Sequence, residues 1–131
     1  MRSGDQVAKH LILLAEDDEV NQEIVRAFLK DAGDLELIVA NDGRAALEAA
    51  LLNKFDLLIV DQNMPFITGD RLVRHLRAVN SRNSMTPVIR FTAEADQRPV
   101  DFKTLDDVAE VTLPKPLRKD ALIQAIRTLL A

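Results

Sequence analysis

The sequence predicts an α/β domain with an open, doubly wound parallel sheet, in which five strands alternate with five helices, (βα)5. Three observations support this prediction. Short apolar runs alternate along the chain with longer segments whose apolar residues recur at helical spacing. The segment 57–60, "LLIV", is apolar throughout, which is typical of a strand covered on both faces. The chain has 131 residues and no linker or repeat that would divide it, so we expect one domain.

The first part of the chain is predicted to form two strand–helix units. Residues 11–14 are a short apolar run, and the helical pattern that follows has Asp18 as its expected N-cap. The segment "LELIVA" at 35–40 is the second predicted strand. The second predicted helix lies in "NDGRAALEAALLN", where Asn41 or Asp42 serves as the N-cap.

The middle of the chain is predicted to form two further strands and one helix. The strands are "FDLLIVD" at 55–61 and "PVIRFT" at 87–92, and the helix is "DRLVRHLRAV" at 70–79. Its apolar residues fall on one face, which we expect to be buried, and its arginines on another, which we expect to be solvated. These faces consist of Leu72, Val73, Leu76 and Val79, and of Arg71, Arg74 and Arg77.

The last part of the chain contains the least regular segment. Pro99 disfavours helical geometry in the residue before it, so a short fourth helix is predicted to begin at Pro99 and to end near Val108. The segment "EVTLP" at 110–114 is the fifth predicted strand, and Pro114, which lacks an N–H group, predicts that this strand lies at an edge of the sheet. The final helix is predicted to bury Leu117, Ala121, Leu122, Ala125, Ile126 and Leu129.

Composition excludes several classes of protein. The chain has no cysteine, which excludes disulfides and thiolate metal sites and fits a reducing compartment, so we expect a cytoplasmic protein. A formal net charge of −4 argues against direct binding to nucleic acid. The apolar runs are far shorter than the roughly 20 residues of a membrane span.

Polar residues follow four of the five predicted strands, at the edge of the sheet where ligands bind in folds of this kind. The first strand is followed by acids, the third by an acid and an amide, the fourth by a hydroxyl and the fifth by an amine. These residues are Glu16, Asp17, Asp18, Asp61, Asn63, Thr92 and Lys115. We expect Val60 to be the last fully covered residue of its strand and Asp61 to emerge beyond it.

This set of residue types suits one chemistry. Clustered carboxylates bind Mg²⁺, which prefers oxygen ligands, while a lysine and a threonine hydroxyl interact favourably with a phosphoryl group. Each residue by itself is more often a helix cap or a solvated loop residue, as Asp18 is expected to be. The prediction of a site depends on their coincidence at four strand ends of one sheet.

Four segments resemble the receiver domain of two-component response regulators: "LILLAEDD", "LLIVDQNMPFITG", "VIRFTAEA" and "LPKP". The resemblance covers residues 9–131 and leaves 1–8 as an N-terminal tail. It implies a flavodoxin-like fold with strand order 2-1-3-4-5. It also implies a regulatory phosphoacceptor domain, which catalyses only its own phosphorylation and dephosphorylation.

The resemblance implies that Asp61 accepts a phosphoryl group from a phosphohistidine of a sensor histidine kinase or a histidine phosphotransfer protein. Asp17, the Asp61 carboxylate and the backbone carbonyl of Asn63 would bind Mg²⁺, and Glu16 would help through a water molecule. The pair formed by Asn63 and Glu94 resembles that of chemotaxis-type receivers, which implies a short-lived phosphoryl group.

The resemblance also implies how the signal leaves the site. Lys115 would pair with Asp61 and later with the phosphoryl oxygen, and a cis peptide bond would precede Pro116. Thr92 would move toward the phosphoryl group. The surface formed by the fourth helix, the fifth strand and the fifth helix would contact an output protein.

Two positions depart from the family pattern. Thr112 stands where the family has an aromatic residue that moves with the threonine. Arg90 lies two residues before Thr92, on the same face of its strand. Because a buried arginine needs a partner, we expect Arg90 to reach past Thr112 toward one of three acids, the alternative being an extension to solvent. The acids are Asp106, Asp107 and Glu110.

Other functions fit the sequence less well. A haloacid dehalogenase-type phosphatase needs a second aspartate two residues after its nucleophile, where this chain has Asn63. A pseudo-receiver that binds partners without phosphorylation would not need the complete acid, threonine and lysine set. A flavin-binding protein of the same fold would need a phosphate-binding loop where this chain has "AEDDE". A stand-alone regulator and a receiver from a hybrid kinase both remain open.

Overall fold

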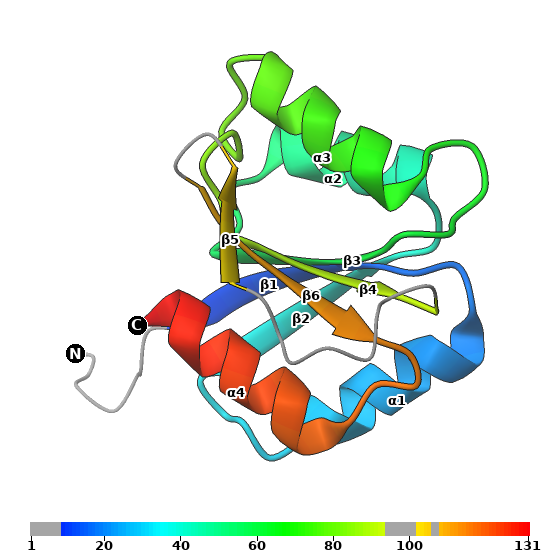
Figure 1. Ribbon diagram of the computed structural model, residues 1–131, viewed down its shortest axis with the longest axis vertical. Helices are drawn as coiled ribbons and strands as arrows, with labels where there is room; N and C mark the ends of the chain where they lie inside the picture. Colours follow the sequence, from blue (N-terminus) through cyan, green and yellow to red (C-terminus); the bar gives the residue numbers. More distant parts are fainter. Residues whose placement is uncertain (1–8, 94–101, 106–107) are drawn as a thin grey trace.

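The computed structural model describes residues 9–93, 102–105 and 108–131, which form a six-stranded sheet between two layers of helices (Figure 1). The strands are β1 (His10–Ala15), β2 (Leu35–Ala40), β3 (Leu57–Asp61), β4 (Val88–Thr92), β5 (Phe102–Leu105) and β6 (Val108–Pro114). The helices are α1 (Glu19–Leu29), α2 (Gly43–Leu52), α3 (Gly69–Ala78) and α4 (Lys119–Leu130).

The sheet has the order β2-β1-β3-β4-β6-β5. Its first five strands in this order are parallel, and they are the five strands expected from the sequence, in the expected order 2-1-3-4-5. β1 and β3 are neighbours in the sheet, and the chain continues from β1 to β2 on one side of this pair and from β3 to β4 on the other. The strand order therefore reverses between β1 and β3. The predicted doubly wound α/β fold is therefore confirmed, and the carboxyl ends of β1 and β3 lie side by side where such folds bind ligands.

Two predictions for the last part of the chain are wrong. Residues Phe102–Leu105, which were expected in a fourth helix, form β5, and β5 pairs antiparallel with β6. The other residues of the expected helix, apart from Val108 at the start of β6, lie outside the described residues. Phenylalanine and threonine favour strands, and pairing with the nearby β6 satisfies the backbone better than a short, weakly amphipathic helix does.

The strand that ends at Pro114 is also not an edge strand, because β6 lies between β4 and β5. The proline rule still holds locally. The β5 ladder reaches only from Val108 to Val111 on β6, so Pro114 lies beyond it and its missing N–H removes no bond between the two strands.

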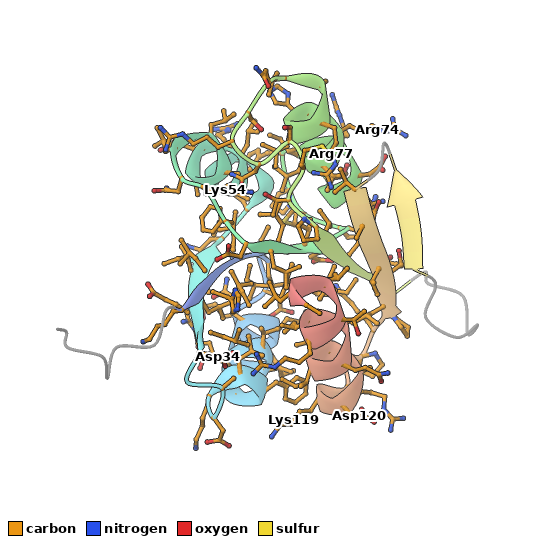
Figure 2. All side chains as sticks on the ribbon, turned by 90° about the vertical axis from the view of Figure 1, so that its left-hand side faces the viewer. Asp34, Lys54, Arg74, Arg77, Lys119 and Asp120 are labelled. Carbon is orange, nitrogen blue, oxygen red and sulfur yellow. The ribbon has the colours of Figure 1, made fainter. Side chains whose placement is uncertain are left out.

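The core consists of two apolar layers, one on each face of the sheet, and side chains fill the space between the sheet and both helix layers (Figure 2). Alternate residues of β3 belong to different layers: Leu57 and Ile59 pack toward α1 and α4, whereas Leu58 and Val60 pack toward α2 and α3. Val88 of β4 belongs to the second layer, so Arg90, two residues later, projects from the α2 and α3 face.

Two helices begin at predicted caps, and a third begins at a cap that was not predicted, Thr68. The Asp18 carboxylate accepts the Val20 N–H at 2.8 Å, the Asp42 carboxylate accepts the Ala45 N–H at 2.7 Å, and Thr68 caps α3. Val79 was expected to be buried, but it follows the end of α3 and is 37% exposed. Among the described residues, no helix has the length and apolar character that a membrane crossing requires.

Candidate functional site

Three carboxylates meet at the carboxyl ends of β1 and β3. One oxygen each of Glu16, Asp17 and Asp61 lies within 4.8 Å of the other two. The sheet register brings them together, because Ala15 of β1 is level with Val60 of β3. Glu16 and Asp61 are buried, at 0% and 1% exposed, whereas Asp17 is exposed. The expectation that Asp61 emerges beyond the covered strand is therefore wrong, because Asp61 is the last residue of β3 and is itself buried.

Lys115 pairs with Asp61. Its Nζ lies 3.0 Å from Asp61 Oδ1 and 5.3 Å from the centroid of the Phe91 ring. The Lys115 backbone N–H donates to the Thr92 carbonyl at 3.1 Å, and the peptide bond between Lys115 and Pro116 is cis. The lysine is thus held by its backbone against β4 and by its side chain against the buried carboxylate.

Glu16 differs electrostatically from an ordinary glutamate. Burial raises its pKa to about 7, and the nearby carboxylates of Asp61 and Asp17 add to the rise, while the Asp18 N–H, which donates to Oε2 at 3.1 Å, opposes it. Its Oε1 is buried and has no hydrogen-bond partner in the described part of the chain. Glu16 therefore resists ionisation unless a positive charge comes close to it.

Gln22 is a functional-site neighbour that the sequence reasoning missed. This buried residue of α1 donates from Nε2 to the Glu16 carbonyl at 2.7 Å and to Asn41 Oδ1 at 3.0 Å. It thereby ties the loop after β1 to the loop after β2. The signal in the sequence was a glutamine at a helix position that faces the sheet.

Thr92 and Asn63 lie next to the acidic cluster. Thr92 ends β4, is 8% exposed, and follows Phe91, which is level with Asp61 in the sheet. Asn63 is exposed, and its backbone N–H donates to Asp61 Oδ1 at 3.2 Å. Glu94, the other residue expected to tune the phosphoryl lifetime, lies outside the described residues.

Arg90 makes one of the contacts expected from the sequence. It lies opposite Thr112 in the sheet, and its Nη2 is 2.5 Å from Glu110 Oε1. Its Nη1 is 3.3 Å from Asp70 Oδ1, a contact that the sequence did not indicate. The side chain is only 18% exposed, so the alternative of an arginine extended to solvent is wrong. Asp106 and Asp107, the other expected partners, lie outside the described residues.

The start of α3 packs directly on the backbone of Asp61. A Cβ atom at Gly69 would lie 2.5 Å from the Asp61 carbonyl oxygen, so only glycine fits this approach. The Gly69 N–H also donates to the Gln62 carbonyl at 3.0 Å. Phe66, in the loop between β3 and α3, has a φ of 71°. The Arg44 guanidinium lies over its ring, 4.5 Å from the ring centroid.

The acidic cluster fits a divalent cation. Its donors are three carboxylates, of which two are buried beside each other, and Glu16 Oε1 offers a ligand atom that no group in the described ranges uses. Hard cations such as Mg²⁺ take oxygen ligands of this type and offset the repulsion between carboxylates. The structure thus supports a metal-binding capacity of Glu16, Asp17 and Asp61.

Comparisons with known proteins agree with this geometry. The family model described as the response regulator receiver domain matches residues 12–127. The chemotaxis protein CheY of Pseudomonas aeruginosa is 38% identical over 84 residues, which are 64% of this chain and 67% of that protein. The response regulator protein PmrA of the same species is 37% identical over 90% of this chain, but the match spans only 51% of that protein.

Solved structures show the same similarity. The chemotaxis protein CheY4 of Vibrio cholerae has a TM-score of 0.76 and 28% identity, covering 94% of this chain and 100% of that one. The receiver domain of a Pseudomonas aeruginosa sensor histidine kinase, solved with a magnesium ion in its active site cleft, has a TM-score of 0.77 and 26% identity, covering 94% and 98%. With its fold, its strand-end acids and a family match over most of its length, this chain belongs to the response regulator receiver domains of two-component systems.

Proposed function

We propose that this domain accepts a phosphoryl group on Asp61 from a phosphohistidine and changes conformation to regulate a protein partner. One observation carries the proposal: Lys115 Nζ lies 3.0 Å from a buried Asp61 whose carboxylate is grouped with those of Glu16 and Asp17. A structural salt bridge does not need two further acids beside it. A phosphoryl acceptor site needs both the lysine and the acids.

The chain's own residues suit the transfer. An Asp61 carboxylate oxygen attacks the phosphorus of the phosphohistidine, a P–O bond forms, the P–N bond breaks, and the electron pair leaves with the imidazole. Lys115 offsets the negative charge of the acceptor before the transfer and of the phosphoryl oxygen after it.

We propose that Mg²⁺ is held by Asp17, Asp61 and the backbone carbonyl of Asn63, with Glu16 acting through a water molecule. When bound, the ion supplies positive charge that offsets the phosphoryl oxygens and the clustered carboxylates. The buried, unpartnered Glu16 oxygen supports this assignment, as does the magnesium ion in the related receiver domain of the sensor histidine kinase.

Thr92 and the sheet beyond it form the proposed response. The Thr92 hydroxyl donates to a phosphoryl oxygen, and the end of β4 moves toward Asp61. A fourth helix was expected at the output surface, but β5 occupies residues 102–105, so the surface proposed to meet an output protein consists of β5, β6 and α4. Asn63, with Glu94, is proposed to make the phosphoryl group short-lived.

The phosphodonor is proposed to be a sensor histidine kinase or a histidine phosphotransfer protein, in the cytoplasm. The relatives include both separate regulators and sensor proteins. The aerobic respiration control sensor protein ArcB of Escherichia coli is 33% identical over 88% of this chain, and the match spans 14% of that protein. A stand-alone regulator and a receiver within a hybrid kinase are both consistent with these relatives.

The proposal is tested by incubating the protein with a small-molecule phosphodonor, acetyl phosphate or phosphoramidate, and Mg²⁺. Intact mass spectrometry should show one added phosphoryl group in the wild type and none in Asp61→Asn. Asp120→Asn, which changes an exposed acid of α4, should label like the wild type. Equal labelling of Asp61→Asn and the wild type, or no labelling of either, would contradict the assignment.

A further inference from the structure

Arg90 joins three elements of the fold through its two terminal nitrogens. Nη2 contacts Glu110 of β6 at 2.5 Å, and Nη1 contacts Asp70 of α3 at 3.3 Å. We call these residues, Asp70, Arg90 and Glu110, the Arg90 triad. Their side chains are 33%, 18% and 11% exposed, so the triad is partly shielded from water and its charges interact more strongly than surface charges.

The triad lies between two parts of the phosphorylation site. Arg90 and Thr92 belong to the same strand and project from the same face, two residues apart. Asp70 follows Gly69, which packs on the Asp61 carbonyl and donates to the Gln62 carbonyl. Asp70 is thus held, through the start of α3, against the backbone of Asp61. Arg90 is held by β4, the strand that ends in Thr92.

A movement of Thr92 toward Asp61 therefore changes the position of Arg90 relative to α3. The two contacts of Arg90 do not resist this change equally. The contact with Glu110 is shorter and more buried, whereas the contact with Asp70 is longer and more exposed. Asp70 also has a second cation, since Arg74 Nη2 lies 3.2 Å from its other oxygen, and it benefits from its place in the first turn of α3. The contact between Arg90 and Asp70 is therefore the one that breaks when Arg90 moves.

We propose that the Arg90 triad carries the phosphorylation state of Asp61 to the first turn of α3. Without a phosphoryl group, Arg90 holds Asp70 and Glu110 together. With one, Arg90 keeps Glu110 and releases Asp70, which then keeps only its existing pair with the exposed Arg74 of α3. This inference rests on the proposed function and makes Arg90 a positioning residue, which acts in place of the aromatic residue that Thr112 replaces.

Hydrogen–deuterium exchange of the α3 amides, before and after labelling with acetyl phosphate and Mg²⁺, tests the inference. In the wild type we expect exchange at residues 70–74 to rise by about fivefold on phosphorylation, the lower end of typical coupling. In Asp70→Asn the unphosphorylated protein should already exchange as the phosphorylated wild type does, so the change should be less than about twofold. Phosphoryl incorporation should be the same in both proteins.

Two further variants separate the switch from a structural role. Arg90→Met keeps much of the side-chain volume and, like Asp70→Asn, should label normally and lose the α3 response. Glu23→Gln removes an ion pair outside the triad, the more exposed pair of Glu23 with Arg26 in α1, and should respond like the wild type. If Arg90→Met does not fold, Asp70→Asn still decides, because Asp70 is partly exposed.

The possible outcomes are distinct. A labelled wild type with unchanged α3 exchange, or an Asp70→Asn protein that keeps the full change, would overturn the inference and leave the proposed function intact. A wild type that takes no label would overturn the proposed function, and the inference with it.

Discussion

Glu16 should make the apoprotein less stable as the pH rises toward neutrality. Its side chain is 0% exposed, and burial, with help from Asp61 and Asp17, raises its pKa from 4.5 to about 7. Between these values the folded protein binds a proton that the unfolded chain has released. The protonated Glu16 therefore contributes fully to the free energy of unfolding below about pH 4.5. This contribution is lost as the pH rises through about 7.

The size of the effect follows from the same shift. One pKa unit corresponds to about 1.4 kcal/mol, so the loss between the two values is on the order of 3 kcal/mol. In Glu16→Gln the neutral amide replaces the protonated acid, and this part of the pH dependence disappears. We expect the variant to become the more stable protein above about pH 7, with the difference largest in the absence of a divalent cation.

Urea unfolding in EDTA, at several values from about pH 5.5 to 8, measures this difference. Circular dichroism is the suitable probe, because the chain has no tryptophan or tyrosine. The two histidines are present in both proteins, so any contribution from them cancels in the comparison. Glu36→Gln, at an exposed position of β2, is the control and should keep the wild-type slope. Equal slopes in the wild type and Glu16→Gln would refute the reasoning.

Two other substitutions test packing at the site and hydrogen bonding in the core away from it. Gly69→Ala places a Cβ atom 2.5 Å from the Asp61 carbonyl oxygen. We therefore expect the free energy of unfolding in urea to fall by about 1–3 kcal/mol and Asp61 to be labelled more slowly. The control is Gly33→Ala, whose Cβ meets nothing within 4 Å and which should change neither quantity. Asn83→Ala removes a fully buried side chain that accepts the Phe55 N–H and donates to the Ala50 and Asn53 carbonyls, so unfolding should become easier by about 2–4 kcal/mol. Its control is Asn80→Ala at an exposed position, and a loss below about 1 kcal/mol for Asn83→Ala would show that these bonds are replaced by water.

The sequence by itself determined the alternating elements and the residues at the strand ends. Apolar periodicity located all five parallel strands, and the side chains of Asp18 and Asp42 marked two helix starts correctly. These features depend on residues close together in the chain, through helical or strand periodicity and local hydrogen bonds, so they can be predicted from the sequence.

Only the tertiary structure decided what depends on distant residues. The strand at 102–105 forms because β6 offers it a partner, which outweighs its weak helical pattern. Asp70 meets Arg90 because α3 and β4 are packed together, although twenty residues separate them in the chain. The burial of Asp61 and Glu16, and the raised pKa of Glu16, follow from how the chain packs around the ends of β1 and β3, where the two carboxylates come together. The sequence determines which groups reach the site, whereas packing decides how close these groups come to one another and how far water is excluded. Closeness and the exclusion of water together control the protonation state of the site groups.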